Sequence, residues 1–254
     1  MEVHHHPDLS HRKKHFREYF LEFLMIFLAV TMGFIAENIR EKISDRSKEK
    51  EYIESLVQDL KTDTGLATRA IKDLTFQMYG MDTLEMLLTP DVNKNDSAVY
   101  ICYRQQSSLH NEHAINFSDR TITQLFSSGN MRLLRDRSVS DQITEYYSEI
   151  KIVESQKSFY TDYFHKCLEI YQEIYEFDEY HSKIDSKGMI SYPRFAYGKN
   201  HIANTNAEDL RKYKSIIEFT KEIISSYRVD IEGLNKQASS LIQFLEQEYS
   251  LSEN

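Results

Sequence analysis

The chain has 254 residues, of which 41% are hydrophobic and 28% charged, and its formal net charge is −9. It contains 3 prolines and 7 glycines, where average usage would give roughly 13 and 18, so the composition argues against a turn-rich β fold and favours long helices. The acidic balance argues against nucleic acid as a partner, because phosphate binding needs clustered Lys and Arg.

Residues 1–18 form a basic, histidine-rich tail at the N-terminus. His4, His5 and His6 are candidate ligands for a transition metal, with His11 and His15 one helical turn apart beyond them. The competing interpretation is a solvated tail near lipid headgroups. We predict no metal and no other cofactor, and keep His4, His5 and His6 only as candidates.

Residues 19–36 form an apolar stretch in which Glu22 is the only charged residue. Eighteen residues are just long enough to cross a bilayer as a helix. The core helix of a soluble domain is disfavoured because Phe20–Ile35 is apolar on all faces, whereas a surface helix keeps a polar side. A cleaved signal peptide is disfavoured because the leader is long and the cleavage site is weak. The sequence therefore predicts one uncleaved transmembrane helix over 19–36.

One face of this predicted helix carries Glu22, Ala29, Gly33 and Ala36. Ala29 and Gly33 form a pair of small residues four apart, which lets two helices approach closely in lipid. Small residues are also common in spans that do not associate. An ionisable group near lipid prefers a protein partner, so Glu22 favours contact with a second helix and allows a homo-oligomer.

A charged helical stalk, residues 37–52, follows the span. From Ile53 onward apolar residues recur every seventh position, as in helices that pack at a shallow angle: Ile53, Leu60, Ala67, Leu74, Met81 and Leu88. Thr89-Pro90 is expected to end this helix.

Further helices are predicted beyond Pro90. A short one covers residues 98–109, and another begins after a cap at Ser118 and runs to Phe126. Gly129 suits the left-handed backbone conformation that commonly ends a helix, a left-handed stop. A long helix opens with Ser138 and ends near Tyr180. The last helix is capped by Asn206 and Asp209, and its stripe again recurs every seventh residue: Leu210, Ile217, Ile224, Ile231, Ala238 and Leu245.

These elements predict an all-α protein. One N-terminal transmembrane helix continues into an elongated antiparallel helical bundle with coiled-coil-like packing over residues 53–248. Residues 249–254 are expected to be a disordered tail. The N-terminus is placed in the cytoplasm, because the basic residues before the span are denser and closer to its edge than those after it.

Two stretches resemble a known family. The first is "MEVHHHP" followed by "EFLMIFLAVTMGFIAENIRE" and "EYIESLVQDL", and the second is "QLFSSGNMRLLRDRSVSDQITEYY". Both are similar to a family of single-span membrane proteins of Gram-negative bacteria defined by a domain of unknown function. The resemblance implies membrane anchoring and a helical body. Together with the orientation predicted above, this predicts a single-pass protein of the bacterial inner membrane with a periplasmic body. The resemblance implies no chemistry.

No catalytic motif is evident: the sequence has no Gly-rich phosphate loop, no HExxH pair and no Gly-x-Ser-x-Gly elbow. His110, Glu112 and His113 are candidate metal ligands in a loop, near Cys102. The competing interpretation is that they are scattered polar residues of the loop. The aromatic run Phe159–Tyr180 suits either core packing or a ligand pocket. Cys102 and Cys167 are compatible with a disulfide or with two buried thiols.

The predicted function is that of a non-enzymatic, membrane-anchored helical bundle that acts through protein contacts, as a scaffold or assembly partner. The expected partners are the lipid bilayer and an unidentified protein. The alternative, from a different class, is a ligand-sensing bundle that signals through a partner protein, because the tail of about eighteen residues is too short to be an output domain of its own.

Overall fold

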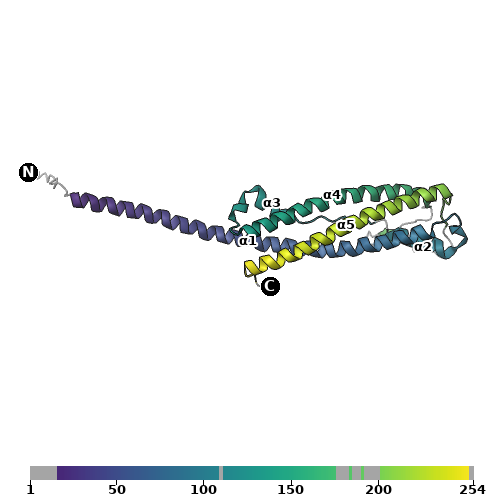
Figure 1. The fold of residues 1–254 in the computed structure, drawn as a ribbon, viewed down its shortest axis with the longest axis horizontal. Helices are drawn as coiled ribbons and strands as arrows, with labels where there is room; N and C mark the ends of the chain where they lie inside the picture. The colour runs from purple at the N-terminus through teal and green to yellow at the C-terminus, as the bar shows by residue number, and fades with distance from the viewer. Residues whose placement is uncertain (1–15, 109–110, 176–182, 185–189, 192–200, 252–254) are drawn as a thin grey trace, which may run out of the picture. The chain divides into compact units, whose positions relative to one another are not determined.

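The computed structural model describes residues 16–108, 111–175, 183–184, 190–191 and 201–251. Within these residues the chain is almost wholly helical (Figure 1). The elements in chain order are α1 (Phe16–Leu87), η1 (Val92–Lys94), α2 (Asp96–Ser108), α3 (Arg120–Ser127), η2 (Asn130–Leu133), α4 (Arg137–Ile174), β1 (Lys183–Ile184), β2 (Ile190–Ser191) and α5 (Ala207–Glu248). Strands β1 and β2 are an antiparallel pair of two residues each. The prediction of a helical protein with a long apolar helix near its N-terminus is confirmed.

The chain divides into two compact units, Met1–Glu51 and Tyr52–Asn254. Helix α1 contributes residues to both. The division lies beside residue 52, where the charged stalk was predicted to give way to the helical body.

The core of the second unit is formed by apolar stripes on its three long helices. Every residue predicted from the seven-residue spacing is buried. The first set lies in α1 and at the residue that follows it, and the second lies in α5: Ile53, Leu60, Ala67, Leu74, Met81 and Leu88, and Leu210, Ile217, Ile224, Ile231, Ala238 and Leu245. Helix α4 adds Val139, Ile143, Tyr146, Ile150, Val153, Tyr160, Phe164, Cys167, Tyr171 and Ile174. At roughly 1.5–3 kcal/mol for each large apolar side chain, this burial is the main stabilising contribution to the fold.

Ion pairs join α1 to α5 at the edge of this core. Lys61 Nζ lies 2.7 Å from Glu246 Oε1, and Lys221 Nζ lies 2.8 Å from Asp82 Oδ1. Helices α4 and α5 lie side by side (Figure 1). The long helices of the second unit are therefore in contact through both apolar and charged side chains.

Three of the predicted helix starts were wrong by one or two residues. Helix α2 begins at Asp96, two residues before the predicted start at residue 98. Helix α3 begins at Arg120 after Asp119 and not after Ser118, whose backbone N–H donates to a carboxylate of α1. At the start of α4 the cap is Asp136, whose side chain accepts the N–H of Ser138 at 2.7 Å. For α3 and α4 the chain enters the helix at a position that the local pattern alone did not specify.

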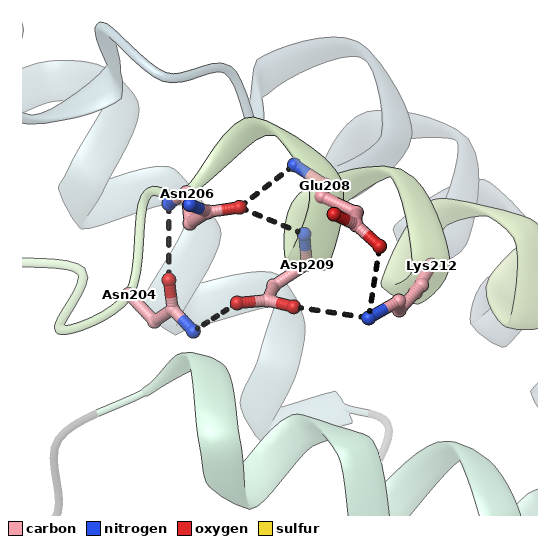
Figure 2. A network of polar contacts seen from close by, with 5 residues as sticks. All are labelled: Asn204, Asn206, Glu208, Asp209 and Lys212. Atoms are coloured by element: carbon pink, nitrogen blue, oxygen red, sulfur yellow. Dashed lines mark hydrogen bonds and ion pairs between the residues drawn. The ribbon is translucent and has the colours of Figure 1, made fainter.

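Asn206 was predicted correctly as the cap at the start of α5. The Asn206 side chain accepts the N–H groups of Glu208 and Asp209, at 2.9 and 3.3 Å (Figure 2). Asp209 does not itself cap the helix; its carboxylate accepts from the Asn204 amide at 3.1 Å and pairs with Lys212 at 3.4 Å. This network satisfies N–H groups that a helix start leaves without partners inside the helix.

The helix ends show one success and one error. Gly129 has a φ of 68°, which confirms the predicted left-handed stop. Helix α4, however, ends at Ile174 and not near Tyr180. Tyr175 turns to an extended conformation and forms an isolated antiparallel bridge with Ile202, so the backbone leaves the helix to pair with the segment that leads into α5.

Candidate functional site

The apolar stretch of α1 is exposed around its whole circumference. None of its most apolar 18-residue window is buried, and residues such as Phe23, Leu28 and Phe34 are exposed. Hydrating so much apolar surface is unfavourable. Among the described helices, α1 is the one long and apolar enough to cross a membrane.

Polar groups of Thr31, Glu37 and Arg40, in and beside this stretch, have partners within the same helix. The hydroxyl of Thr31 donates to the carbonyl oxygen of Phe27 at 2.8 Å. Just beyond the stretch, Arg40 Nη2 lies 2.6 Å from Glu37 Oε1. An isolated helix can enter hydrocarbon only if its backbone and hydroxyl groups are satisfied internally, and this stretch meets that condition at Thr31.

The predicted contact face of this helix is exposed as a whole: Glu22, Ala29, Gly33 and Ala36. A Cβ built on Gly33 would meet nothing within 4 Å outside the helix itself. The face has no role in packing the described parts of this chain, and its contact with a second helix stays a prediction.

The predicted metal ligands do not form a site in the described residues. His4, His5 and His6 lie outside them, as does His110. Glu112 and His113 are described but bond to different partners. No group of three or more His, Cys, Asp or Glu side chains suited to a metal occurs in the described part of the chain.

The described side chains of the aromatic run Phe159–Tyr180 lie partly in the core and partly at the surface. Tyr160, Phe164, Tyr171 and Tyr175 are buried, whereas Phe159 is 55% exposed. The buried rings contact one another, with centroids 5.9 Å apart for Tyr160 and Phe164 and 4.7 Å apart for Tyr171 and Tyr175. Residues 176–180 lie outside the described residues. The buried rings of the run therefore pack the core, as helical spacing of aromatic residues commonly indicates.

The two cysteines are separate thiols. Cys102 and Cys167 are both free and buried, so the disulfide left open by the sequence is absent. Burial raises the pKa of each thiol to about 12. Protonated, buried thiols are chemically inert, and both residues act as small apolar groups.

Residues 111–119, which we name the bridging segment, contact all three long helices without forming regular structure. The backbone N–H of His113 donates to the hydroxyl of Tyr160 on α4 at 2.8 Å. The N–H of Ile115 donates to the hydroxyl of Tyr227 on α5 at 3.2 Å. These two tyrosine rings stack with centroids 5.2 Å apart. His113 Nδ1 also lies 3.8 Å from Asp73 Oδ2 on α1.

Side chains of the bridging segment make two further contacts with α4. Glu112 accepts a hydrogen bond from the hydroxyl of Thr161 at 2.6 Å, and Asn116 accepts one from the ammonium of Lys157. Because buried backbone polar groups need partners, an extended segment on a helical surface must find them in side chains. The hydroxyls of Tyr160 and Tyr227 are such partners for the N–H groups of His113 and Ile115.

The end of the bridging segment is held by two buried aspartates one turn apart on α1. Asp63, 2% exposed, accepts the N–H of Ser118 with both oxygens, at 3.0 and 3.1 Å. Asp59, 7% exposed, accepts from the hydroxyl of Thr121 at 2.5 Å and from Arg120 at 3.0 Å. Burial raises the pKa of Asp63 to about 6; the Asp59 charge adds to this and the Ser118 N–H opposes it.

Sequence reasoning missed these aspartates, although a signal was present. Asp63 follows Leu60 by three residues, and Gln77 follows Leu74 by three, so both lie on the buried stripe of α1. A polar residue at a position where the spacing predicts an apolar one indicates a buried polar contact.

Apolar side chains are also exposed on the outer surface of α4 and α5. We name Phe159, Tyr163 and Phe219 the outer aromatic face. The rings of Tyr163 on α4 and Phe219 on α5 have centroids 4.8 Å apart, and the Lys166 ammonium lies 4.0 Å from the Tyr163 centroid. Phe219 is 46% exposed. Large exposed aromatic groups of this kind occur often at protein contact surfaces.

Comparisons of the chain with protein-family models, with curated proteins and with solved structures find no match. The resemblance drawn from the two quoted sequence stretches therefore stays a prediction.

Proposed function

We propose that the chain is a single-pass protein of a bacterial inner membrane, anchored by residues 19–36. The observation that supports this most is the exposure of the apolar stretch on every face. A water-soluble helix of this composition would need a partner for all its faces, whereas a bilayer covers them all at once. The family resemblance points the same way.

The proposed orientation places the N-terminus in the cytoplasm and the body in the periplasm. The bases Arg12, Lys13, Lys14 and Arg17 are concentrated close to the N-terminal edge of the stretch. Positive charge near a span favours the cytoplasmic side, and long domains cross the membrane largely regardless of their charge.

Residues 53–248 form, in this proposal, an elongated antiparallel bundle with coiled-coil-like packing. Along α1 the ion-pair residues run from Lys61 to Asp82, and their partners on α5 run backwards from Glu246 to Lys221. Helices that run in opposite directions give this reversed order. Buried residues every seventh position on both helices support a shallow crossing angle.

The proposed activity of this bundle is protein contact, as a scaffold or assembly partner. The outer aromatic face supports it, because Phe159 and Phe219 are large aromatic side chains that stay exposed on helices α4 and α5. In the membrane, the face with Glu22, Ala29, Gly33 and Ala36 is proposed to join copies of the chain.

The test is affinity purification of the full chain from membranes in mild detergent, with partners identified by mass spectrometry. Phe219→Ser combined with Phe159→Ser is expected to lose specific partners. The matched control is Met86→Ser, which removes a side chain that is 70% exposed on α1 and is expected to keep them. Recovery of the same partners with both variants would contradict the proposed contact surface, and a wild-type chain purified alone and monomeric would contradict the scaffold function.

A further inference from the structure

We propose that Asp59 and Asp63 form an acid-sensitive latch, which holds the bridging segment on α1 more tightly at pH 5 than at pH 7. This inference concerns the second unit alone and does not depend on the proposed membrane anchor or partner.

The balance of charge in the cluster is the first argument. Two buried carboxylates lie one turn apart, and the cation that contacts them is Arg120, whose side chain is 70% exposed and bonds to Asp59. Asp63 shares a single backbone N–H, that of Ser118, between both of its oxygens. When both carboxylates are ionised, the described contacts leave negative charge uncompensated in a buried place. One proton removes the repulsion between them.

The surroundings of Asp63 supply the second argument. Tyr146 of α4 faces it, close enough for the Asp63 charge to help raise the tyrosine pKa, although burial is the larger cause. The hydroxyl of Tyr146 is buried and has no hydrogen-bond partner among the described residues. A tyrosine hydroxyl can bond to either form of a carboxyl but carries no positive charge. Tyr146 therefore does not compensate the charge of an ionised Asp63, and the neighbouring Asp59 adds to that charge.

The direction of the pH effect follows from linkage. An exposed aspartate has a pKa near 3.8, whereas that of buried Asp63 is about 6. At pH values between these two pKa values, Asp63 therefore takes up a proton when the bridging segment closes over it. The equilibrium for closing rises as pH falls through 6, by roughly tenfold between pH 7 and pH 5.

His113, at the other end of the bridging segment, acts in the opposite direction. Burial lowers its pKa, and the nearby Asp73 carboxylate offsets this only in part. The closed segment therefore prefers neutral His113, and acid weakens that end. His113→Gln removes this titration and leaves the backbone hydrogen bond from residue 113 to Tyr160 available.

Hydrogen exchange read by mass spectrometry tests the latch on the full chain in detergent. In the His113→Gln protein, peptides covering residues 111–121 are expected to be roughly tenfold more protected at pH 5 than at pH 7, after correction for the intrinsic pH dependence of amide exchange. Adding Asp63→Asn should abolish this difference, because asparagine keeps an acceptor for Ser118 and does not titrate. Adding Asp82→Asn instead, at an ion pair with Lys221, should preserve it.

Two results overturn the proposal. One is equal protection of residues 111–121 at both pH values in the His113→Gln protein. The other is a pH dependence that survives Asp63→Asn. Peptides from the middle of α5 report in the same experiment whether each variant is folded, and the pH comparison within the His113→Gln protein decides the matter even if Asp63→Asn unfolds the chain.

Discussion

Replacing Leu28 and Val30 together with arginine is expected to release the protein from the membrane. Both residues lie near the centre of 19–36, and both are exposed, at 48% and 53%. They are two positions apart on the helix and so point in widely different directions, which leaves the new charges without a common partner. The free energy of inserting a helix into the membrane rises by about 2.5–3.5 kcal/mol for an arginine at the helix centre, where Leu and Val lower it. Two substitutions cost roughly 6–8 kcal/mol.

The assay is an alkaline carbonate wash of membranes, with the chain detected in pellet and supernatant. Flotation on a density gradient separates membrane-bound protein from aggregates that also pellet. The matched control is Ile39→Arg, a residue that is 54% exposed but lies beyond the predicted span, and this variant should stay with the membrane. A double-arginine chain that floats with the lipid as the wild type does would refute the anchor.

Three further outcomes are expected of the second unit. Tyr227→Phe leaves the N–H of Ile115 without its acceptor and should lower the free energy of unfolding by about 1–3 kcal/mol in urea titrations followed by circular dichroism; an unchanged midpoint would mean that water replaces the hydroxyl. Asn206→Ala removes the α5 cap and should cost about 1 kcal/mol in the same titration, with Asn206→Asp as a control of nearly unchanged stability. Cys102 and Cys167 should resist alkylation at pH 8 until the chain is denatured, since burial keeps both protonated; rapid labelling of the folded chain would show that their surroundings open.

Local chemistry was enough to predict some element boundaries and insufficient for others. Asn206 was identified as a cap because its side chain bonds to N–H groups only two and three residues away. Ser118 is an equally good cap by residue type, yet α3 begins one residue later, and Ser118 is held by its N–H to Asp63, 55 residues earlier in the chain. Between Asp136 and Ser138 the choice was equally open, because both residue types are favoured caps.

The end of α4 shows how tertiary packing overrides a periodic pattern. Helical spacing of aromatic residues continues toward Tyr180, yet the backbone leaves the helix at Tyr175. That ring packs edge-on against Tyr103 of α2, with centroids 5.1 Å apart, and its backbone pairs with Ile202. Neither partner is close in sequence, so no local rule specifies where the helix stops.

The polar residues on the buried stripes carry information that hydrophobic periodicity discards. Asp63 and Lys157 both contact the bridging segment directly. Gln77 contacts it through Tyr160, which donates to Gln77 at 3.4 Å while accepting from the segment. An apolar residue in place of Asp63 would keep the stripe intact but would leave the N–H of Ser118 without its acceptor, at about 1–3 kcal/mol. An apolar residue in place of Gln77 would remove the acceptor of the Tyr160 hydroxyl. An Asp, Gln or Lys at a position where the spacing predicts an apolar residue thus marks where a non-helical segment crosses a helical body. In this chain these residues identify where the bridging segment crosses the long helices, whereas the sequence pattern alone predicts only an irregular loop there.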